Sequence, residues 1–258
     1  MDQFSGPGRS LDGAFTSLYW ENPMSDYDLY YWGVPFRGQF VRAILAFAGK
    51  GWTEFDADVI ADMMQADPDN QPVPFMAPPV LIDNRTGFAL SQMPAIAVYL
   101  GTDLDLIPGT KELRAMTAKV VNDANDVIDE ITLNGGREMW TPETWAEFVP
   151  RLKRWMTIWE VIAASHGLKE DEGFLLGTGK AGVADIVTST LWSTLRDKFP
   201  SIGSLLDETA PRIAGLSRRL QQLPSLRALK AASDRKFGTA YCGGEIEKSL
   251  EKVAGSSA

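Results

Sequence analysis

The sequence is poor in the residues that build disulfides and metal sites. Its 258 residues include one cysteine, Cys242, and one histidine, His166. A single cysteine forms no internal disulfide framework and no thiolate metal cluster, and a single histidine excludes any site that needs two imidazoles. We therefore expect a protein without a metal ion that works in a reducing cytoplasm.

Positive charge and long apolar runs are also scarce. The chain carries 25 Lys and Arg against 34 Asp and Glu, a formal net charge of −9. Without an excess of cations to neutralise phosphates, binding to nucleic acid or to an anionic membrane is not expected. The apolar runs fall well short of the roughly 20 residues that a membrane span needs. The composition, 45% hydrophobic and 10% aromatic, is otherwise that of a globular protein with a substantial core.

The first 24 residues have a composition of their own, with many Gly, Ser and Asp. They lack the charged-then-apolar order of a secretory signal, and we expect a flexible extension over 1–24. Two interpretations stay open: Met24 is an alternative start, or the extension packs on the body of the protein through apolar side chains. Those side chains are Phe15, Leu18, Tyr19 and Trp20.

Residues 25–105 alternate between strand patterns and helix patterns, with turn residues between them. The expected elements are a strand at 28–33, a helix at 40–50, a strand at 52–60, a short helix or irregular loop at 61–74, a hairpin of "PPVLID" and "GFAL" around "NRTG", and a helix at 94–107. This order, βαβ, a loop and then ββα, predicts an α/β domain with a mixed sheet.

After a short linker at 108–110, the chain has helical spacing of apolar residues throughout. The expected helices cover 113–131, 145–159 with Pro150 as a kink, 183–195, and 213–229 with a break at Pro224. We expect an all-helical domain at 110–247 and a frayed tail at 248–258. The predicted fold class is therefore α/β plus all-α.

Three stretches of the sequence resemble motifs of the glutathione transferase superfamily. "PPVLID" resembles the cis-proline strand of its thioredoxin-like half, and "LSQMPAIAVYLG" resembles the helix start "L-T-Q-S-N-A-I-L-R-Y-L-G". "FLLGTGKAGVADIVTSTLW" resembles the conserved segment of its helical half. The three occur in the family's order over residues 27 to about 230. The resemblance implies a thioredoxin-like domain that binds glutathione, followed by a helical bundle.

The resemblance also implies where glutathione binds. Pro79 matches the cis-proline, before which a peptide ligand pairs like an added strand. The preceding residue is then Pro78, which offers a carbonyl but no N–H; a shifted register would make Pro78 cis, with Ala77 before it. At the helix start Gln92 matches the family, but Met93 replaces the serine, so a backbone N–H remains and the hydroxyl is lost.

Charge around this region is unusual for a site that binds an anionic tripeptide. From 51 to 84 there is no Lys or Arg, and seven residues are acidic. Glutathione would depend on Arg37, on Arg42 or Lys50, or on neutral hydrogen bonds from Trp52 and Gln71. As a solvated acidic loop, the segment needs no special function.

In the family, a Tyr, Ser or Cys at the end of the first strand stabilises the glutathione thiolate. "YYWGVPFRG" resembles the tyrosine-type "Y-W-D-I-R-G" with two additional residues, which makes Tyr31 the catalytic candidate. Alignment on the "S-P-F" pattern instead places Val34 there, which can donate nothing. No Ser or Cys occurs from 27 to 52, which disfavours those mechanisms. The plain alternative is that Tyr30 or Tyr31 only packs on the sheet.

The pocket for the second substrate is expected between the first-strand loop and the first two long helices. An apolar lining suits hydrophobic electrophiles. The candidate residues are Val34, Phe36, Met116, Val120 and Trp140. In the helical half, Asp185 is expected to accept from the backbone of Gly182 in half of a capping box, a structural role. Cys242 lies far along the chain from the expected site and is assigned no role.

The resemblance implies a cytosolic, homodimeric glutathione transferase that serves detoxification. Its bound glutathione, activated as a thiolate, would attack a hydrophobic electrophilic small molecule. A rival interpretation is a protein of the same fold that is catalytically silent and binds a ligand or a partner. Pro78, Met93 and the acidic segment 51–84 favour the rival.

Overall fold

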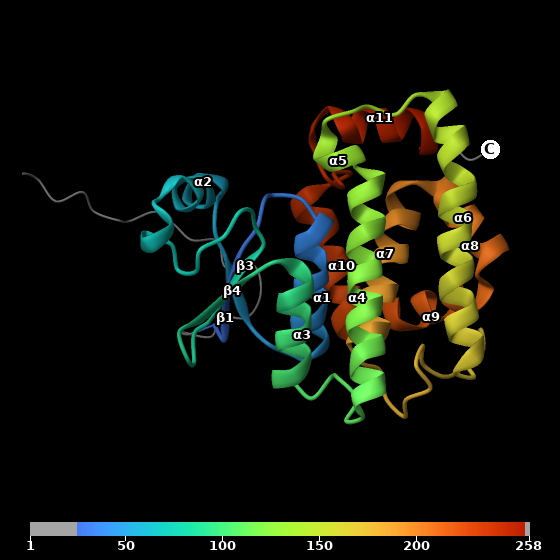
Figure 1. Ribbon diagram of the computed structural model, residues 1–258, viewed down its shortest axis with the longest axis horizontal. Coiled ribbons are helices and arrows are strands. Elements are labelled where there is room, and N and C mark those ends of the chain that lie inside the picture. Colours follow the sequence, from blue (N-terminus) through green and yellow to red (C-terminus); the bar gives the residue numbers. More distant parts are fainter. Residues whose placement is uncertain (1–24, 256–258) are drawn as a thin grey trace, which may run out of the picture.

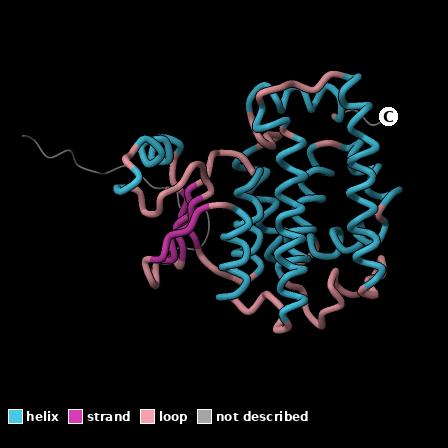
Figure 2. Tube along the Cα trace, viewed as in Figure 1, coloured by secondary structure: helices cyan, strands magenta, loops and turns pink. Residues whose placement is uncertain are grey.

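The strands gather at one end of the molecule and the long helices at the other (Figures 1 and 2). The structure, a computed structural model, describes residues 25–255, and the expectations for 1–24 lie outside this part of the chain. Within these described residues, no helix combines the length and the apolar character that a membrane span requires. The strand-bearing part precedes the helical part, as the sequence predicts.

Four short strands form a mixed sheet in the order β2-β1-β3-β4. They are β1 (Tyr27–Tyr30), β2 (Trp52–Glu54), β3 (Val80–Asp83) and β4 (Phe88–Ser91). β1 and β2 are parallel, and the other two neighbouring pairs are antiparallel. Side chains alternate along β1, so Leu29 lies in the main core while Tyr30 packs in a small cluster on the opposite face. The hairpin of β3 and β4 confirms the predicted one.

Helices cover both faces of this sheet. α1 (Phe36–Phe47) and α3 (Met93–Asp103) lie between the sheet and the helical domain, and α2 (Ala57–Gln65) lies on the far side (Figure 1). The strand expected over 52–60 is wrong beyond Glu54, because α2 begins at Ala57. The alternation that predicted the strand has only three apolar members. The segment from Ala57 also fits a helix, and that helix buries Ile60. A 3-10 helix, η1 (Pro68–Asn70), follows.

Eight helices of the described chain build the second part. They are α4 (Lys111–Ile131), α5 (Leu133–Gly136), α6 (Pro142–Ser165), α7 (Val183–Lys198), α8 (Pro200–Thr209), α9 (Pro211–Gln221), α10 (Pro224–Phe237) and α11 (Gly244–Ala254). α7 is buried along most of its length and lies at the centre of the bundle, where Trp192 meets Trp159 of α6 edge to face at 5.5 Å. The four predicted helical stretches are confirmed; α5, α8 and α11 were not predicted.

The frayed tail expected at 248–258 is wrong for the residues that the structure describes. Residues 244–254 form α11, in which Leu250 and Ala254 are fully buried. The Ser249 hydroxyl accepts the Trp140 N–H at 3.1 Å, and the Ser201 hydroxyl donates to the Ala254 carbonyl at 2.8 Å. The Gly and Ser residues near the end of the chain suggested fraying. The apolar residues among them nevertheless have helical spacing, and α11 buries them against the bundle. Residues 256–258 lie outside the described part.

The linker between the two parts is tied to the start of α7. The Gly182 N–H donates to the Asp185 carboxylate at 2.9 Å, and the Leu175 N–H donates to its other oxygen at 2.6 Å. The Val183 N–H donates at 2.9 Å to the carbonyl of Leu106, which lies between α3 and α4. The structural role predicted for Asp185 is confirmed by these contacts.

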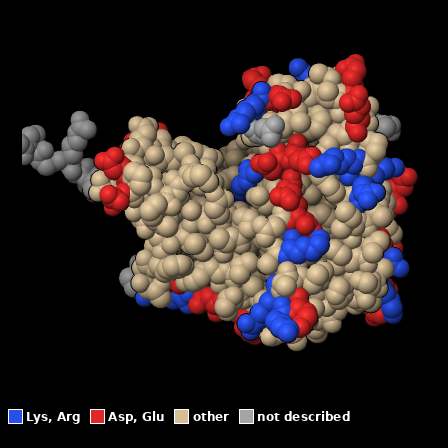
Figure 3. Space-filling view, in the orientation of Figure 1, with Lys and Arg blue, Asp and Glu red and all other residues tan. Residues whose placement is uncertain are grey.

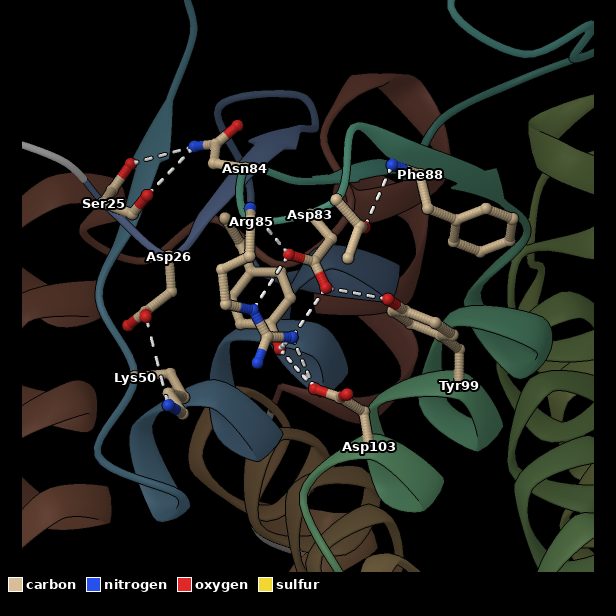
Figure 4. Close-up of polar contacts among 11 residues, drawn as sticks. Ser25, Asp26, Lys50, Asp83, Asn84, Arg85, Phe88, Tyr99 and Asp103 are labelled. Atoms are coloured by element: carbon tan, nitrogen blue, oxygen red, sulfur yellow. Dashed lines mark hydrogen bonds and ion pairs between the residues drawn. The ribbon is translucent and has the colours of Figure 1, made fainter.

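A network of charges closes the sheet at the far end of β3 (Figure 4). The Asp83 side chain is buried and accepts from the Arg85 guanidinium at 2.6 and 3.0 Å and from the Tyr99 hydroxyl at 2.8 Å. Arg85 also binds Asp103 of α3 at 2.6 Å, and the Tyr27 hydroxyl donates to the same carboxylate at 3.0 Å. The network joins β1, β3 and α3.

We expect this network to weaken in acid. The Arg85 guanidinium, with the Tyr99 hydroxyl, lowers the pKa of Asp83 to about 2, against burial, which raises it. Because the folded-state pKa lies below the usual value of 3.8, Asp83 stabilises the fold above about pH 4, and this stabilisation disappears as the pH falls toward 2. Asp83→Asn should lower the free energy of unfolding at pH 7 by about 2–3 kcal/mol.

Urea unfolding of wild type and Asp83→Asn across pH 2–7 checks this expectation. The difference between the two proteins should shrink toward the acid end. Asp105→Asn is the matched control, because Asp105 forms a fully exposed ion pair with Lys180, and solvent screens such a pair strongly. A difference between wild type and Asp83→Asn that stays constant with pH would contradict the assignment.

Candidate functional site

Three strand ends meet at one edge of the sheet. The first residue of β3 pairs with the last residue of β1 on one side and with the last residue of β4 on the other. The residues just beyond this row are Tyr31 after β1, Pro79 before β3 and Gln92 after β4, so they lie side by side. They are the positions at which the sequence predicts a glutathione site. The surface is hollowed between the two parts of the molecule, on the side where α2 faces α11 (Figure 3).

Tyr31 directly follows β1, and its side chain lies against the first turn of α1. Its side chain is 4% exposed, and its hydroxyl accepts the backbone N–H of Arg37 at 3.1 Å. Burial raises the pKa of Tyr31 to about 12, although Arg37 and Arg42 act to lower it. The phenol therefore keeps its proton at neutral pH and can donate it to an acceptor.

Gly38 explains why the sequence has an Arg-Gly pair at this point. A Cβ at Gly38 would lie 2.3 Å from the ring of Tyr31, which is far closer than atoms can approach. The tyrosine ring therefore lies directly against the backbone of α1. A side chain at position 38 would displace this ring, so the position favours glycine.

Arg42 braces the loop between β1 and α1 from inside the protein. Its guanidinium donates to the carbonyls of Val34 at 3.1 Å and Pro35 at 3.3 Å, and it binds Glu54 of β2 at 2.7 and 3.1 Å. Arg42 is 2% exposed. Burial raises the pKa of Glu54, but Arg42 and Lys236 outweigh burial and lower that pKa to about 2. Arg42 thus fixes the loop and is not available to a ligand.

The other candidate ligands for the glutathione carboxylates also have protein partners. Arg37 binds Asp129 of α4 at 2.9 Å, and Lys50 lies 3.9 Å from Asp26. The Gln71 side chain donates to the Met63 carbonyl and accepts the Phe75 N–H, so it holds its own loop together. Arg37 remains partly exposed, with its guanidinium at the domain boundary.

The cis peptide bond is Pro78-Pro79, which confirms the first of the two predicted registers; the register with cis Pro78 after Ala77 is wrong. Both prolines are buried, whereas Met76, just before them, is 84% exposed. The residue before the cis-proline therefore presents a carbonyl and no N–H, and one of the two pairing groups is missing.

The start of α3 presents Gln92 and hides Met93. Gln92 is exposed, with φ of 74°, a left-handed conformation that is rare for a residue with a side chain and that concentrates at functional sites. The Met93 side chain is fully buried in the main core. Because Pro94 has no N–H, the free amides of this first turn are those of Met93 and Ala95. Met93 can therefore contribute only its backbone.

The residues predicted for the second-substrate pocket do not all come together. Val34 and Phe36 follow Tyr31 in the chain; Phe36, the first residue of α1, is buried in the same core cluster as Tyr31, and Val34 packs against that cluster. Met116 is half-buried on α4, and Val120 is fully buried. Trp140 packs against Trp145 and Phe148, with its indole N–H donating to the Ile131 carbonyl at 2.8 Å. Val120 and Trp140 are core residues in this structure.

Sequence reasoning missed the contribution of the segment between α10 and α11. The Phe36 N–H donates to the Tyr241 carbonyl at 3.2 Å, which brings residues 241–243 to the loop after β1. Burial, with Glu247 next to it, raises the pKa of the Cys242 thiol to about 12, so this cysteine stays protonated. No local pattern in "TAYCGGE" signals this contact, because it joins positions some 200 residues apart in the chain. Among residues 25–255, no group of three or more His, Cys, Asp or Glu could hold a metal ion.

A family model described as "Glutathione S-transferase, C-terminal domain" matches residues 116–253, more than half of the chain. The chain belongs to the glutathione S-transferase family. A search of curated proteins finds no match. The family membership confirms the resemblance that the three motifs indicate, and its matched region covers the helices from α4 to α11.

Solved structures, among them a glutathione S-transferase, have the same fold as this family member. "Structure of NaGST-2" matches with 22% identity and a TM-score of 0.65, covering 81% of this chain and 97% of that one. A Pi-class glutathione S-transferase of Onchocerca volvulus matches with 15% identity and a TM-score of 0.67, covering 85% and 98%. Prostaglandin synthase D of Nilaparvata lugens matches with 19% identity and a TM-score of 0.60, covering 80% and 96%. At these identities the likeness concerns the fold, a thioredoxin-like domain followed by a helical one.

Proposed function

We propose that this protein is a glutathione transferase that joins the thiolate of glutathione to a hydrophobic electrophilic small molecule. The observation that carries the proposal is the meeting of Tyr31, Pro79 and Gln92 at one sheet edge. These residues flank β1 and the hairpin of β3 and β4, which lies some 50 residues further along the chain. Together they supply a hydroxyl, a backbone carbonyl before a proline, and a helix start.

Glutathione would bind along this edge in an extended form. Its cysteinyl backbone N–H would donate to the Pro78 carbonyl, while Pro78 offers no N–H in return. Its γ-glutamyl carboxylate would lie at the start of α3, where Gln92 and the N–H of Met93 meet the positive end of the helix dipole. Arg37, which is partly exposed, would add positive charge. No metal takes part in this binding.

Catalysis would follow from the Tyr31 hydroxyl. A hydrogen bond to the sulfur favours the thiolate over the thiol, whose proton passes to solvent. The sulfur then attacks the electrophilic carbon; the S–C bond forms as the leaving group departs with its electron pair. Val34 and Phe36 would provide apolar contacts for that substrate.

A silent binding protein remains the second candidate, and specific contacts favour it. Met93 is buried, Arg42 and Lys50 have acidic neighbours, and Pro78 lacks an N–H. These features lower the expected affinity for an anionic tripeptide, but they leave the Tyr31 hydroxyl and the start of α3 in place. The two candidates differ in whether the sulfur of glutathione is activated.

A conjugation assay with glutathione and a generic aryl halide separates them. We expect wild type to catalyse the reaction, and Tyr31→Phe to lower kcat/KM at pH 7 by about tenfold, because loss of one hydrogen bond raises the thiol pKa by about one unit. The control is Tyr30→Phe, which removes a hydroxyl on the opposite face of the sheet. A rate equal to the uncatalysed one in wild type would leave the silent binding protein as the better description.

A second copy of this chain is the proposed partner. Residues 70–102 contain only two charged side chains, Asp83 and Arg85. The face over β4 and α3 accordingly shows few charges (Figure 3). Met76 and Phe88 are 84% and 47% exposed on these segments, which suits burial in a homodimer. Sedimentation velocity at micromolar concentration would show whether the dimer forms.

A further inference from the structure

The segment between α10 and α11 forms one wall of the site at the end of β1. The Phe36 N–H donates to the Tyr241 carbonyl at 3.2 Å, and the two rings meet edge to face with centroids 5.4 Å apart. A Cβ at Gly243 would lie 3.7 Å from the Val34 side chain. This segment therefore contacts the same loop that carries Tyr31.

Tyr241 is held in a fixed place by contacts on several sides. The buried Glu247 accepts the backbone N–H of Tyr241 at 2.9 Å and that of Cys242 at 2.8 Å, and it also accepts the N–H of Gly243. The Tyr241 ring also meets the Phe199 ring edge to face, with centroids 5.3 Å apart. A side chain positioned in advance can meet a ligand without further loss of conformational entropy.

The contacts given so far involve the backbone and the ring of Tyr241, and not its hydroxyl. The residue is 2% exposed, yet within residues 25–255 its hydroxyl makes no hydrogen bond. Burial raises the pKa of Tyr241 well above 10; Cys242, Tyr31 and Glu247 raise it further, and Arg37 acts to lower it. The phenol is therefore a protonated donor, and the contacts of Tyr241 with Phe36 place this residue beside the loop that joins Tyr31 to Arg37.

The Tyr31 hydroxyl is in a related situation. It accepts the Arg37 N–H, but its own proton goes to no acceptor in the described part of the chain. Two phenol protons are thus uncommitted in the neighbourhood of one guanidinium. A sulfur anion suits such a place, because it accepts several hydrogen bonds and carries the charge that donors and a cation favour.

We propose that Tyr241 is a second catalytic hydroxyl, which together with Tyr31 donates a hydrogen bond to the sulfur anion of bound glutathione. This inference rests on the proposed function and adds to it a residue from the far end of the chain. The thiol proton passes to solvent, and neither tyrosine changes its protonation state. Each hydrogen bond lowers the pKa of the bound thiol.

The test follows the thiolate absorbance of bound glutathione against pH in wild type and in three variants, Tyr31→Phe, Tyr241→Phe and the double variant. Each single change should raise the pKa of the bound thiol by about one unit, which is about tenfold less thiolate at a pH below that value. The double variant should shift the pKa further than either single one. Tyr30→Phe should leave it unchanged.

The outcomes separate this inference from the proposed function. A bound-thiol pKa in Tyr241→Phe equal to that of wild type, with Tyr31→Phe shifted, overturns the second hydroxyl and leaves the transferase intact. A wild-type protein with no thiolate signal at saturating glutathione overturns both. Melting temperature gives an independent check: Tyr241→Phe removes an unpaired hydroxyl, so its melting temperature should not fall. A clear fall would show that the hydroxyl is bonded inside the protein, and would also overturn the inference.

Discussion

Replacing Arg42 by Met is expected to lower the free energy of unfolding by about 3–5 kcal/mol, the range found when one partner of a buried ion pair is removed. Arg42 is 2% exposed and binds both oxygens of Glu54. Its loss would leave Glu54 with Lys236 and Trp52 as partners. It would also leave two carbonyls of the loop after β1 without their donor.

The matched control for this prediction is Lys236→Met. Lys236 binds the same carboxylate at 2.8 Å, but it is one-third exposed, so its loss should cost about 1 kcal/mol or less. The double variant Arg42→Met and Glu54→Met should recover part of the stability, because no buried charge then remains unpaired. Chemical unfolding of the four proteins measures all of these effects. If Arg42→Met lost no more free energy of unfolding than Lys236→Met, the stabilising role of buried Arg42 would be contradicted.

Replacing Met93 by Ser, the residue that the resembling family motif has here, should lower the free energy of unfolding by about 2–5 kcal/mol. The Met93 side chain is fully buried in the main core, so a serine would leave a cavity and place a hydroxyl in apolar surroundings. Met93→Leu, which conserves volume, should cost less than about 1.5 kcal/mol. Urea unfolding compares both variants with wild type.

The same pair of variants tests the direction of the side chain at the start of α3. If Met93 pointed toward the ligand, Met93→Ser would keep its stability and bind glutathione more tightly. We expect the opposite, a loss of stability with no gain in affinity, because only the backbone N–H of this residue reaches the site. An unchanged stability together with tighter binding would contradict the burial of Met93.

Sequence was a good guide wherever the physical signal is local. The turn "NRTG" marks the hairpin of β3 and β4, and the 3.6-residue spacing in 113–131 marks α4. The double proline left two candidates for the cis bond, and the resemblance of "PPVLID" to the family strand favoured Pro78-Pro79, which is the one found. Each of these features depends on residues close together in the chain.

The errors concern features that depend on distant parts of the chain. A three-residue alternation predicted a strand through 57–60, where packing of Ile60 on the sheet makes a helix. Gly and Ser near the end of the chain suggested fraying, yet Leu250 is buried against the bundle. Val120 was expected to line a pocket, and it lies in the core. Helical spacing shows that a residue is buried, but not against what.

In the site, too, the motifs are local in sequence, whereas their assembly depends on distant parts of the chain. Tyr31, Pro79 and Gln92 were each predicted from a motif, and only the register of three strands places them together. Tyr241 carries no motif at all. Its contact with Phe36 arises because the segment after α10 returns to the loop after β1, a path that depends on the whole helical domain.

A crystal structure with glutathione tests most directly whether the three strand ends form a binding site. We predict electron density along that edge at millimolar ligand, with the sulfur within hydrogen-bond distance of the Tyr31 hydroxyl and the γ-glutamyl carboxylate at the Met93 N–H. Crystals that grow at that ligand concentration with an empty edge, or with the tripeptide bound elsewhere on the molecule, would contradict it.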